Sequence, residues 1–165
     1  LNKKIKFITI LSDQNSWLNE YIPYLITKLW FEEYEVRWIH NLNDLKKGDI
    51  CLILSFSRKI QKEKLLLNKK NLIVYENDFK KDEGFSSISW QILEVKNKII
   101  NSLIESDIPF HSSKIYNQES TNLNKNKLLD NWQKLKARKI ISLCTEWIKN
   151  YPDTPSSYTK SLIVD

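Results

Sequence analysis

The chain has 165 residues, of which 41% are hydrophobic, and its 26 lysines and arginines exceed its 20 aspartates and glutamates to give a formal net charge of +6. This length provides one domain with a substantial core and does not require a second. The positive charge is spread along the chain instead of gathering with arginine and aromatic residues, which disfavours a nucleic-acid interface. The net charge is the only feature that still permits one.

The first half of the chain alternates apolar runs with helical patterns. Apolar runs predict four buried strands, at residues 5–11, 34–39, 50–54 and 72–74. Helices or turns are expected between and around them, at residues 17–29, 43–44, 60–67 and 69–71. Pro23 falls early in the first helix, where we expect some distortion. This alternation predicts an α/β fold with a mostly parallel central sheet flanked by helices.

The second half is less regular. Residues 88–94 predict a helix, and residues 99–104 and 114–116 predict short strands. The polar segment 117–126 is interpreted either as a loop or as a poorly ordered linker. An apolar stripe over 128–151 predicts a long C-terminal helix. We therefore assign residues 1–151 to one domain and residues 152–165 to an irregular tail.

The sequence offers little for metal or membrane chemistry. Cys51 and Cys144 fall in apolar patterns and are expected to be buried, reduced residues, which suits a cytoplasmic location. The only histidines are His40 and His111, and no CxxC motif occurs, so we expect no metal site. No apolar run approaches the ~20 residues that span a bilayer, so we expect no membrane partner. The chain opens on Leu1 and contains no methionine, so we expect its natural start to lie upstream.

Loops that follow the predicted parallel strands are the expected ligand positions, because such sheets bind ligands outside the carboxyl ends of their strands. These loops are residues 12–17, 55–58 and 75–87. No glycine-rich phosphate motif follows the first strand, and the only glycines are Gly48 and Gly84, which disfavours dinucleotide binding.

One segment carries a family resemblance. Residues 71–99 read NLIVYENDFKKDEGFSSISWQILEVKNKI and include the run Trp-Gln-Ile-Leu-Glu at 90–94. This run, preceded by Asp78, Gly84 and Ser86, resembles the central signature of the formyltransferase superfamily. Similar short motifs at 15–18, 48–50, 54–57 and 128–130 extend the likeness over about residues 5–151. The resemblance implies a Rossmann-like formyltransferase fold, in the branch of methionyl-tRNA and sugar N-formyltransferases and nearer the sugar enzymes.

The resemblance also implies a reaction, the transfer of a formyl group from 10-formyltetrahydrofolate to a primary amine, here expected on a nucleotide-linked amino sugar. Enzymes of this kind use a histidine at the end of the fourth strand, an asparagine two residues earlier and an aspartate further on. Those positions here hold Tyr75, Ile73 and His111. The implied catalytic positions are Tyr75, Asn77, Asp78 and His111.

Ligand contacts follow from the same resemblance. The folate is expected at the end of the third strand and under a closing loop, at Leu54, Ser55, Phe56, Ser57, Gly84 and Phe85, with Phe56 stacked on the pteridine. The amine is expected to approach from the turn formed by Asn15, Ser16 and Trp17.

Two functions stay open. The first is a working formyltransferase with a rearranged site, in which His111 accepts the proton, Asp78 orients it, and Asn77 or a backbone N–H stabilises the oxyanion. Tyr75 is a poor base at neutral pH, because a tyrosine has an ordinary pKa near ~10. The second is a non-catalytic relative that retains a folate or nucleotide pocket, in which each of these residues has only a structural role.

Overall fold

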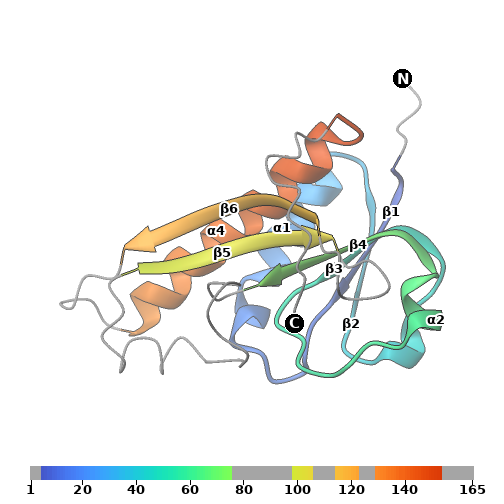
Figure 1. The fold of residues 1–165 in the computed structure, drawn as a ribbon, viewed down its shortest axis with the longest axis horizontal. Coiled ribbons are helices and arrows are strands. Elements are labelled where there is room, and N and C mark those ends of the chain that lie inside the picture. The colour runs from blue at the N-terminus through green and yellow to red at the C-terminus, as the bar shows by residue number, and fades with distance from the viewer. Residues whose placement is uncertain (1–4, 76–97, 106–113, 123–128, 154–165) are drawn as a thin grey trace, which may run out of the picture.

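The computed structural model describes residues 5–75, 98–105, 114–122 and 129–153. A six-stranded sheet in the order β2-β1-β3-β4-β5-β6 runs through these residues (Figure 1). Its strands are β1 (Phe7–Leu11), β2 (Glu35–Ile39), β3 (Gly48–Ile53), β4 (Asn68–Tyr75), β5 (Lys98–Glu105) and β6 (Lys114–Asn122). The helices are η1 (Trp17–Glu20), α1 (Ile22–Phe31), η2 (Leu42–Asp44), α2 (Lys62–Leu65) and α4 (Leu129–Asn150), where η marks a 3-10 helix.

Strands β1 to β4 are parallel, which confirms the mostly parallel α/β prediction. Strands β5 and β6 extend the sheet with two antiparallel pairings. The carboxyl ends of β1 to β4 therefore lie along one side of the sheet, called the carboxyl edge below, and their starts form the amino edge. Ligand sites of parallel sheets belong at the carboxyl edge.

Apolar side chains alternate between the two faces of the sheet. On one face, Ile8 and Ile10 of β1 belong to a core that α1 and α4 complete. On the other face, Cys51 and Ile53 of β3 pack with Leu65 of α2. Strands covered on both faces read as uninterrupted apolar runs, which is why β1 and β3 were visible in the sequence.

Both cysteines are buried and free, as expected. Burial raises the pKa of the Cys51 thiol and of the Cys144 thiol to about 12. Both therefore act as small core residues with the thiol protonated.

The helix predicted over 17–29 is instead two elements, the 3-10 helix η1 and the α-helix α1. The Ser16 hydroxyl accepts a hydrogen bond from the Leu18 N–H at 3.2 Å and begins η1. Pro23 lies at the start of α1, where a backbone N–H would have no helical partner. The expected distortion is thus avoided by starting a new helix.

Strand β4 includes the residues 69–71 that were expected to turn, so that prediction is wrong. The Nζ of Lys69 lies 2.6 Å from Asp49 Oδ1, and the Nζ of Lys70 lies 2.5 Å from Glu105 Oε1. The local composition predicted a polar turn at these lysines, because the carboxylates that neutralise them are distant in sequence.

Strand β6 is likewise longer than predicted. Residues 117–122, read as a loop or linker, pair with β5 as far as Lys98 opposite Asn122. This edge strand is polar because part of it faces water, so its composition resembles that of a loop. The strand over 99–104 and the long C-terminal helix are confirmed by β5 and α4. The helix expected at 88–94 lies outside the described residues.

Candidate active site

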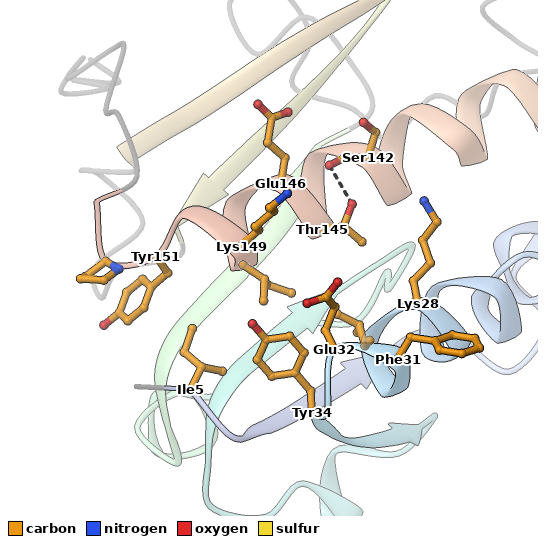
Figure 2. Close-up of a pocket in the computed structure, with 13 residues that line it drawn as sticks. Ile5, Lys28, Phe31, Glu32, Tyr34, Ser142, Thr145, Glu146, Lys149 and Tyr151 are labelled. Carbon is orange, nitrogen blue, oxygen red and sulfur yellow. Dashed lines mark hydrogen bonds between the residues drawn. The ribbon is translucent and has the colours of Figure 1, made fainter. Parts of the chain in front are cut away.

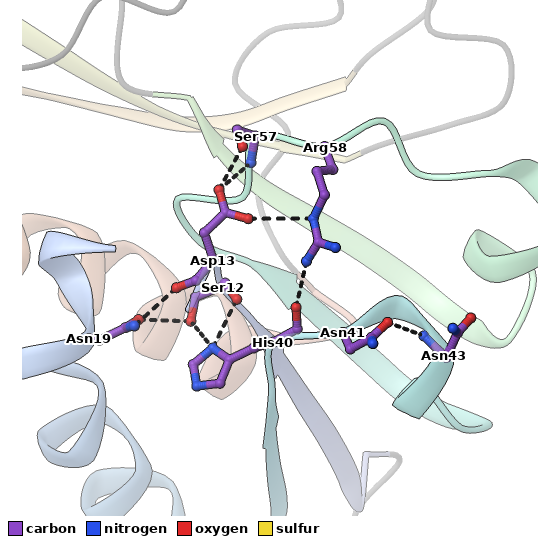
Figure 3. A network of polar contacts seen from close by, with 8 residues as sticks. All are labelled: Ser12, Asp13, Asn19, His40, Asn41, Asn43, Ser57 and Arg58. Atoms are coloured by element: carbon purple, nitrogen blue, oxygen red, sulfur yellow. Dashed lines mark hydrogen bonds and ion pairs between the residues drawn. The ribbon is translucent and has the colours of Figure 1, made fainter. Parts of the chain in front are cut away.

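The carboxyl edge brings together the loops after β1 and β3, two of the three loops expected to bind ligands (Figure 3). The Leu54 N–H donates to the Leu11 carbonyl at 2.9 Å, which continues the pairing of β1 with β3 past the end of β3. The Asp13 N–H then donates to the Ser55 carbonyl at 3.2 Å. Ser55 has a left-handed φ of 54°, which turns the chain sharply at this point.

Asp13 clamps these two loops. Its Oδ2 accepts hydrogen bonds from the Ser57 N–H at 2.9 Å and from the Ser57 hydroxyl at 2.7 Å. Charge-assisted hydrogen bonds of this kind are stronger than neutral ones. The clamp therefore fixes the loop after β3 against the turn after β1.

Arg58 extends the contacts to β2. Its Nη2 donates to the His40 carbonyl at 2.7 Å, and its Nε lies 3.8 Å from Asp13 Oδ1. The guanidinium also lies over the Phe56 ring, 4.9 Å from the ring centroid. One arginine thus joins the loops that follow β1, β2 and β3.

His40 follows β2 and is held in one tautomer. Its Nδ1 lies 3.0 Å from the Ser12 carbonyl, and a carbonyl only accepts, so Nδ1 carries the proton in the neutral ring. The Ser12 hydroxyl accepts from Trp38 Nε1 at 3.0 Å and donates to Asn19 Oδ1 at 2.8 Å. The imidazole is held by its bond to the Ser12 carbonyl and by edge-on packing against the Trp38 ring, with the ring centroids 5.1 Å apart.

The turn predicted to meet the amine is well ordered by its own contacts. The Asn19 amide donates to the Asp13 and Gln14 carbonyls at 3.0 and 2.9 Å. Trp17 packs edge-on against Tyr21, and the buried Lys136 of α4 places its Nζ 5.5 Å from the Trp17 ring centroid. Asn15 is exposed, and the Ser16 hydroxyl already accepts the capping hydrogen bond described above.

The four predicted folate residues after β3 divide into two kinds. Leu54 and Phe56 are buried, with exposed fractions of 1% and 8%, and Phe56 belongs to the core on the α2 face. Ser55 is partly buried, and Ser57 is exposed and meets Asp13. The accessible groups of this loop are therefore hydroxyls, backbone and the Arg58 guanidinium.

The fourth strand supplies one predicted catalytic position. Tyr75 is the last residue of β4 and pairs with Ser102 of β5. The positions Asn77, Asp78, Gly84, Phe85 and His111 lie outside the described residues. Whether the third loop joins the other two thus stays a prediction.

A separate hollow of about 850 Å³ lies at the amino edge (Figure 2). Its walls come from the starts of β1 and β2 and from the ends of α1 and α4, with Ile5, Tyr34, Glu146 and Tyr151 among them. Burial, and then the Glu32 carboxylate, raise the pKa of the Tyr34 phenol. We place the candidate site at the opposite edge, because the strands of a parallel sheet deliver their ligand-binding loops there.

Across the described ranges there is no group of three or more histidine, cysteine or carboxylate side chains arranged to hold a metal ion. No helix in that part of the chain is long and apolar enough to cross a bilayer.

Sequence reasoning named the loops but missed three residues within or beside them, Asp13, His40 and Arg58. Asp13 and Arg58 lie inside predicted loops but were not predicted as site residues, since neither belongs to a recognisable motif. His40 directly follows a predicted strand, and that position was the available signal.

The sequence matches no protein-family model and no curated protein, so the relationship rests on three-dimensional structure. HypX from Aquifex aeolicus superposes with a TM-score of 0.74 at 17% identity, over 96% of this chain and 29% of HypX. Methionyl-tRNA formyltransferase from Clostridium thermocellum gives a TM-score of 0.71 at 16% identity, over 95% of this chain and 70% of the enzyme. A sugar N-formyltransferase from a Shewanella species gives 0.67 at 9% identity, over 93% and 73%.

The chain has the formyltransferase fold. This confirms the fold that the Trp-Gln-Ile-Leu-Glu run suggested, although the run itself lies outside the described residues. The chain spans less than a third of HypX and about 70% of the length of the methionyl-tRNA formyltransferase. HypX has also been solved in complex with tetrahydrofolic acid, with a TM-score of 0.65 to this chain at 16% identity.

Proposed function

We propose that this chain is a formyltransferase that binds 10-formyltetrahydrofolate at the carboxyl edge and formylates the primary amine of a nucleotide-linked amino sugar. The observation that carries the proposal is the clamp between Asp13 and Ser57. It places the turn proposed for the amine beside the loop proposed for the folate. A transfer between two bound molecules requires such adjacency, because the amine must lie within reach of the formyl carbon.

The reaction sets the demands on the site. The amine nitrogen attacks the formyl carbon, a tetrahedral oxyanion forms, and the bond from that carbon to N10 of the folate breaks. The amine loses a proton and N10 gains one, so the products are a formamide and tetrahydrofolate. The site must therefore supply a proton acceptor and hydrogen-bond donors for the oxyanion.

We assign these roles as the family resemblance suggests. His111 accepts the amine proton, Asp78 orients it, and Asn77 or a backbone N–H donates to the oxyanion. Tyr75, the last residue of β4, is the residue that the resemblance aligns with the usual histidine. A phenol there serves better as a hydrogen-bond donor than as a base.

The folate fits this loop in part. Ser57 and Arg58 present polar groups that suit the hydrogen-bonding rim of a pteridine or the carboxylates of its glutamate tail. Phe56 fits less well as a stacking platform, because its ring is buried and the Arg58 guanidinium lies over it. Direct stacking on Phe56 requires Arg58 to move.

The second candidate function is a non-catalytic protein that binds folate or a nucleotide. It is favoured by one observation, the presence of Tyr75 and Ile73 on β4 where the family places its histidine and asparagine. A protein that keeps the clamp between the loops but lacks these two groups keeps the loops together without the chemistry.

A formyl-transfer assay separates the two functions. The natural chain and the Tyr75→His, His111→Asp double variant are each supplied with 10-formyltetrahydrofolate and a panel of nucleotide-linked amino sugars, and folate binding is measured by calorimetry. Turnover by the natural chain supports the enzyme. Folate binding without turnover, with activity only in the double variant, supports the binding protein. No folate binding by either protein contradicts the enzyme and the folate-binding form of the second function.

A further inference from the structure

We propose that Arg58 binds an oxyanion, a phosphate or carboxylate oxygen carried by one of the two substrates, at the carboxyl edge of the sheet. The inference names a ligand chemistry and a residue that neither the family resemblance nor the structural neighbours assign. It rests on the proposed function only for the identity of the molecule that carries the oxyanion.

Arg58 is oriented before any ligand arrives. Its Nη2 donates to the His40 carbonyl at 2.7 Å, and its Nε lies 3.8 Å from Asp13 Oδ1 (Figure 3). The guanidinium also lies over the Phe56 ring, 4.9 Å from its centroid. A long side chain normally loses rotamer freedom when it captures a ligand, at a cost of ~0.5–1.5 kcal/mol. In Arg58 these three contacts already restrict the rotamer, so ligand binding carries less of this entropy cost.

The orientation leaves donors available. A guanidinium has five N–H groups, and one hydrogen of Nη2 satisfies the His40 carbonyl. Nη1 has no hydrogen-bond partner among the described residues, and the side chain is 57% exposed. Nη1 and Nη2 lie in one plane and form the fork with which arginine binds phosphate and carboxylate groups bidentately, and each keeps at least one hydrogen for a ligand.

The charges around the guanidinium sum to a positive value, even though one neighbour is a carboxylate. Asp13 directs its Oδ2 to Ser57, and its Oδ1 is farther from Arg58 Nε than a direct hydrogen bond allows. The carboxylate therefore orients the guanidinium without occupying its outer fork. Lys59 follows in the chain and is exposed, so the local charge of the loop remains positive.

Two sources can supply the oxyanion, the diphosphate of a nucleotide-linked sugar and the glutamate carboxylates of the folate. Four probes distinguish them, each titrated by calorimetry: pyrophosphate, inorganic sulfate as a weakly binding reference, tetrahydrofolate, and tetrahydropterin, which lacks the glutamate. The proteins are the natural chain, Arg58→Gln, Arg58→Lys, and Arg37→Gln as the matched control. Arg37 is an exposed arginine within β2, away from the carboxyl edge.

We expect Arg58→Gln to weaken one anionic probe by about tenfold or more, in line with the loss of a charge-assisted bidentate contact. Loss of pyrophosphate binding assigns the phosphate source. Loss of tetrahydrofolate binding with unchanged tetrahydropterin binding assigns the carboxylate source. Arg58→Lys keeps the charge but not the fork and is expected to recover only part of the affinity, while Arg37→Gln leaves all probes unchanged.

Three results overturn the inference. They are unchanged binding of both anions by Arg58→Gln, equal weakening of tetrahydrofolate and tetrahydropterin with pyrophosphate unchanged, and no binding of either anion by the natural chain. The second result is expected if Arg58 only holds the loops together and does not contact the ligand. Pyrophosphate binding that depends on Arg58, in a chain without formyl transfer, contradicts the proposed enzyme and leaves this inference standing. Thermal unfolding of each variant verifies that the fold is intact.

Discussion

Asp49 and Asp13 perform similar tasks at opposite edges of the same sheet. At the amino edge, Asp49 Oδ2 accepts from the Lys6 and Phe7 N–H groups at 2.8 and 2.9 Å, while its Oδ1 meets Lys69. At the carboxyl edge, Asp13 Oδ2 accepts from the Ser57 N–H and hydroxyl. Each carboxylate ties β1, or the turn after it, to β3 or the loop after it.

The two clamps differ in burial and in what they hold. The Asp49 side chain is 11% exposed and joins the beginnings of strands, so its contacts serve the sheet itself. The Asp13 side chain is 30% exposed and joins loops, next to an arginine that is mostly exposed. The same chemistry therefore stabilises the fold at one edge and positions accessible polar groups at the other. The predictions below test that division of roles.

The largest effect on stability is expected from Asp49→Ala. The change leaves two partly buried backbone N–H groups without their acceptor and removes the partner of Lys69. Unsatisfied donors of this kind cost ~1–3 kcal/mol each, and partial access of water reduces the sum to about 2–3 kcal/mol of unfolding free energy. Urea denaturation measures the loss.

Lys69→Gln is the matched control for Asp49→Ala, because it removes the exposed side of the same ion pair and keeps the backbone hydrogen bonds. Exposed ion pairs contribute little, so a much smaller loss is expected. Equal losses in the two variants would show that the ion pair, and not the backbone clamp, is what Asp49 provides.

A smaller effect is expected from Glu105→Gln at the same edge. The buried Glu105 carboxylate accepts from Lys70 Nζ and from the Tyr116 hydroxyl. Glutamine keeps the volume and one acceptor but places amide hydrogens near a lysine, so we expect a loss of about 1–2 kcal/mol by denaturation. Tyr116→Phe, which removes only the hydroxyl, should cost less, and the reverse order would contradict this account.

The Asp49 clamp should also weaken in acid. Burial by itself raises the pKa of the Asp49 carboxyl, but the hydrogen bonds from Lys69, Phe7 and Lys6 outweigh burial and hold that pKa below its usual value. A carboxyl with a lowered folded-state pKa stabilises fully above its unfolded pKa of ~3.9 and loses that contribution as pH falls through the folded value.

The difference in unfolding free energy between the natural chain and Asp49→Asn should therefore be constant between about pH 5 and 7 and shrink below about pH 4. Denaturation at a series of pH values measures it. A difference that persists unchanged at low pH would mean that the charge on Asp49 is not what the clamp requires.

The same two edges show what the sequence could reveal. Residues 5–11 and 50–54 predicted buried strands because both faces of β1 and β3 are covered, and such strands need no long-range information to recognise. Residues 69–71 were misread because Asp49 and Glu105, which neutralise Lys69 and Lys70, are distant in sequence. Polar residues in β6 were misread for a different reason, because part of this edge strand faces water and its composition resembles that of a loop.

The candidate site was foreseen as a set of loops but not as a set of contacts. The rule that parallel sheets bind ligands at their carboxyl edge located residues 12–17 and 55–58. It could not show that Arg58 covers Phe56 or that Asp13 captures Ser57, since those contacts depend on the left-handed turn at Ser55. A family motif predicts which positions belong to a site. It does not predict the hydrogen bonds between loops, because these depend on residues outside the motif.

Asp13→Ala is expected to weaken ligand binding strongly while changing stability little. Its partners are near the surface, so water replaces the lost bonds and the unfolding free energy should fall by only about 1 kcal/mol. Release of Ser57 and Arg58 should nevertheless weaken folate binding by about tenfold, because the loop must then be ordered by the ligand. The matched control is Glu35→Ala, because Glu35 is an exposed carboxylate on β2 that pairs with Lys6. This variant should leave folate binding unchanged. If Asp13→Ala instead destabilised the protein as much as Asp49→Ala and bound folate normally, the two edges would have the same structural role, and the clamp between the loops would no longer support a ligand site.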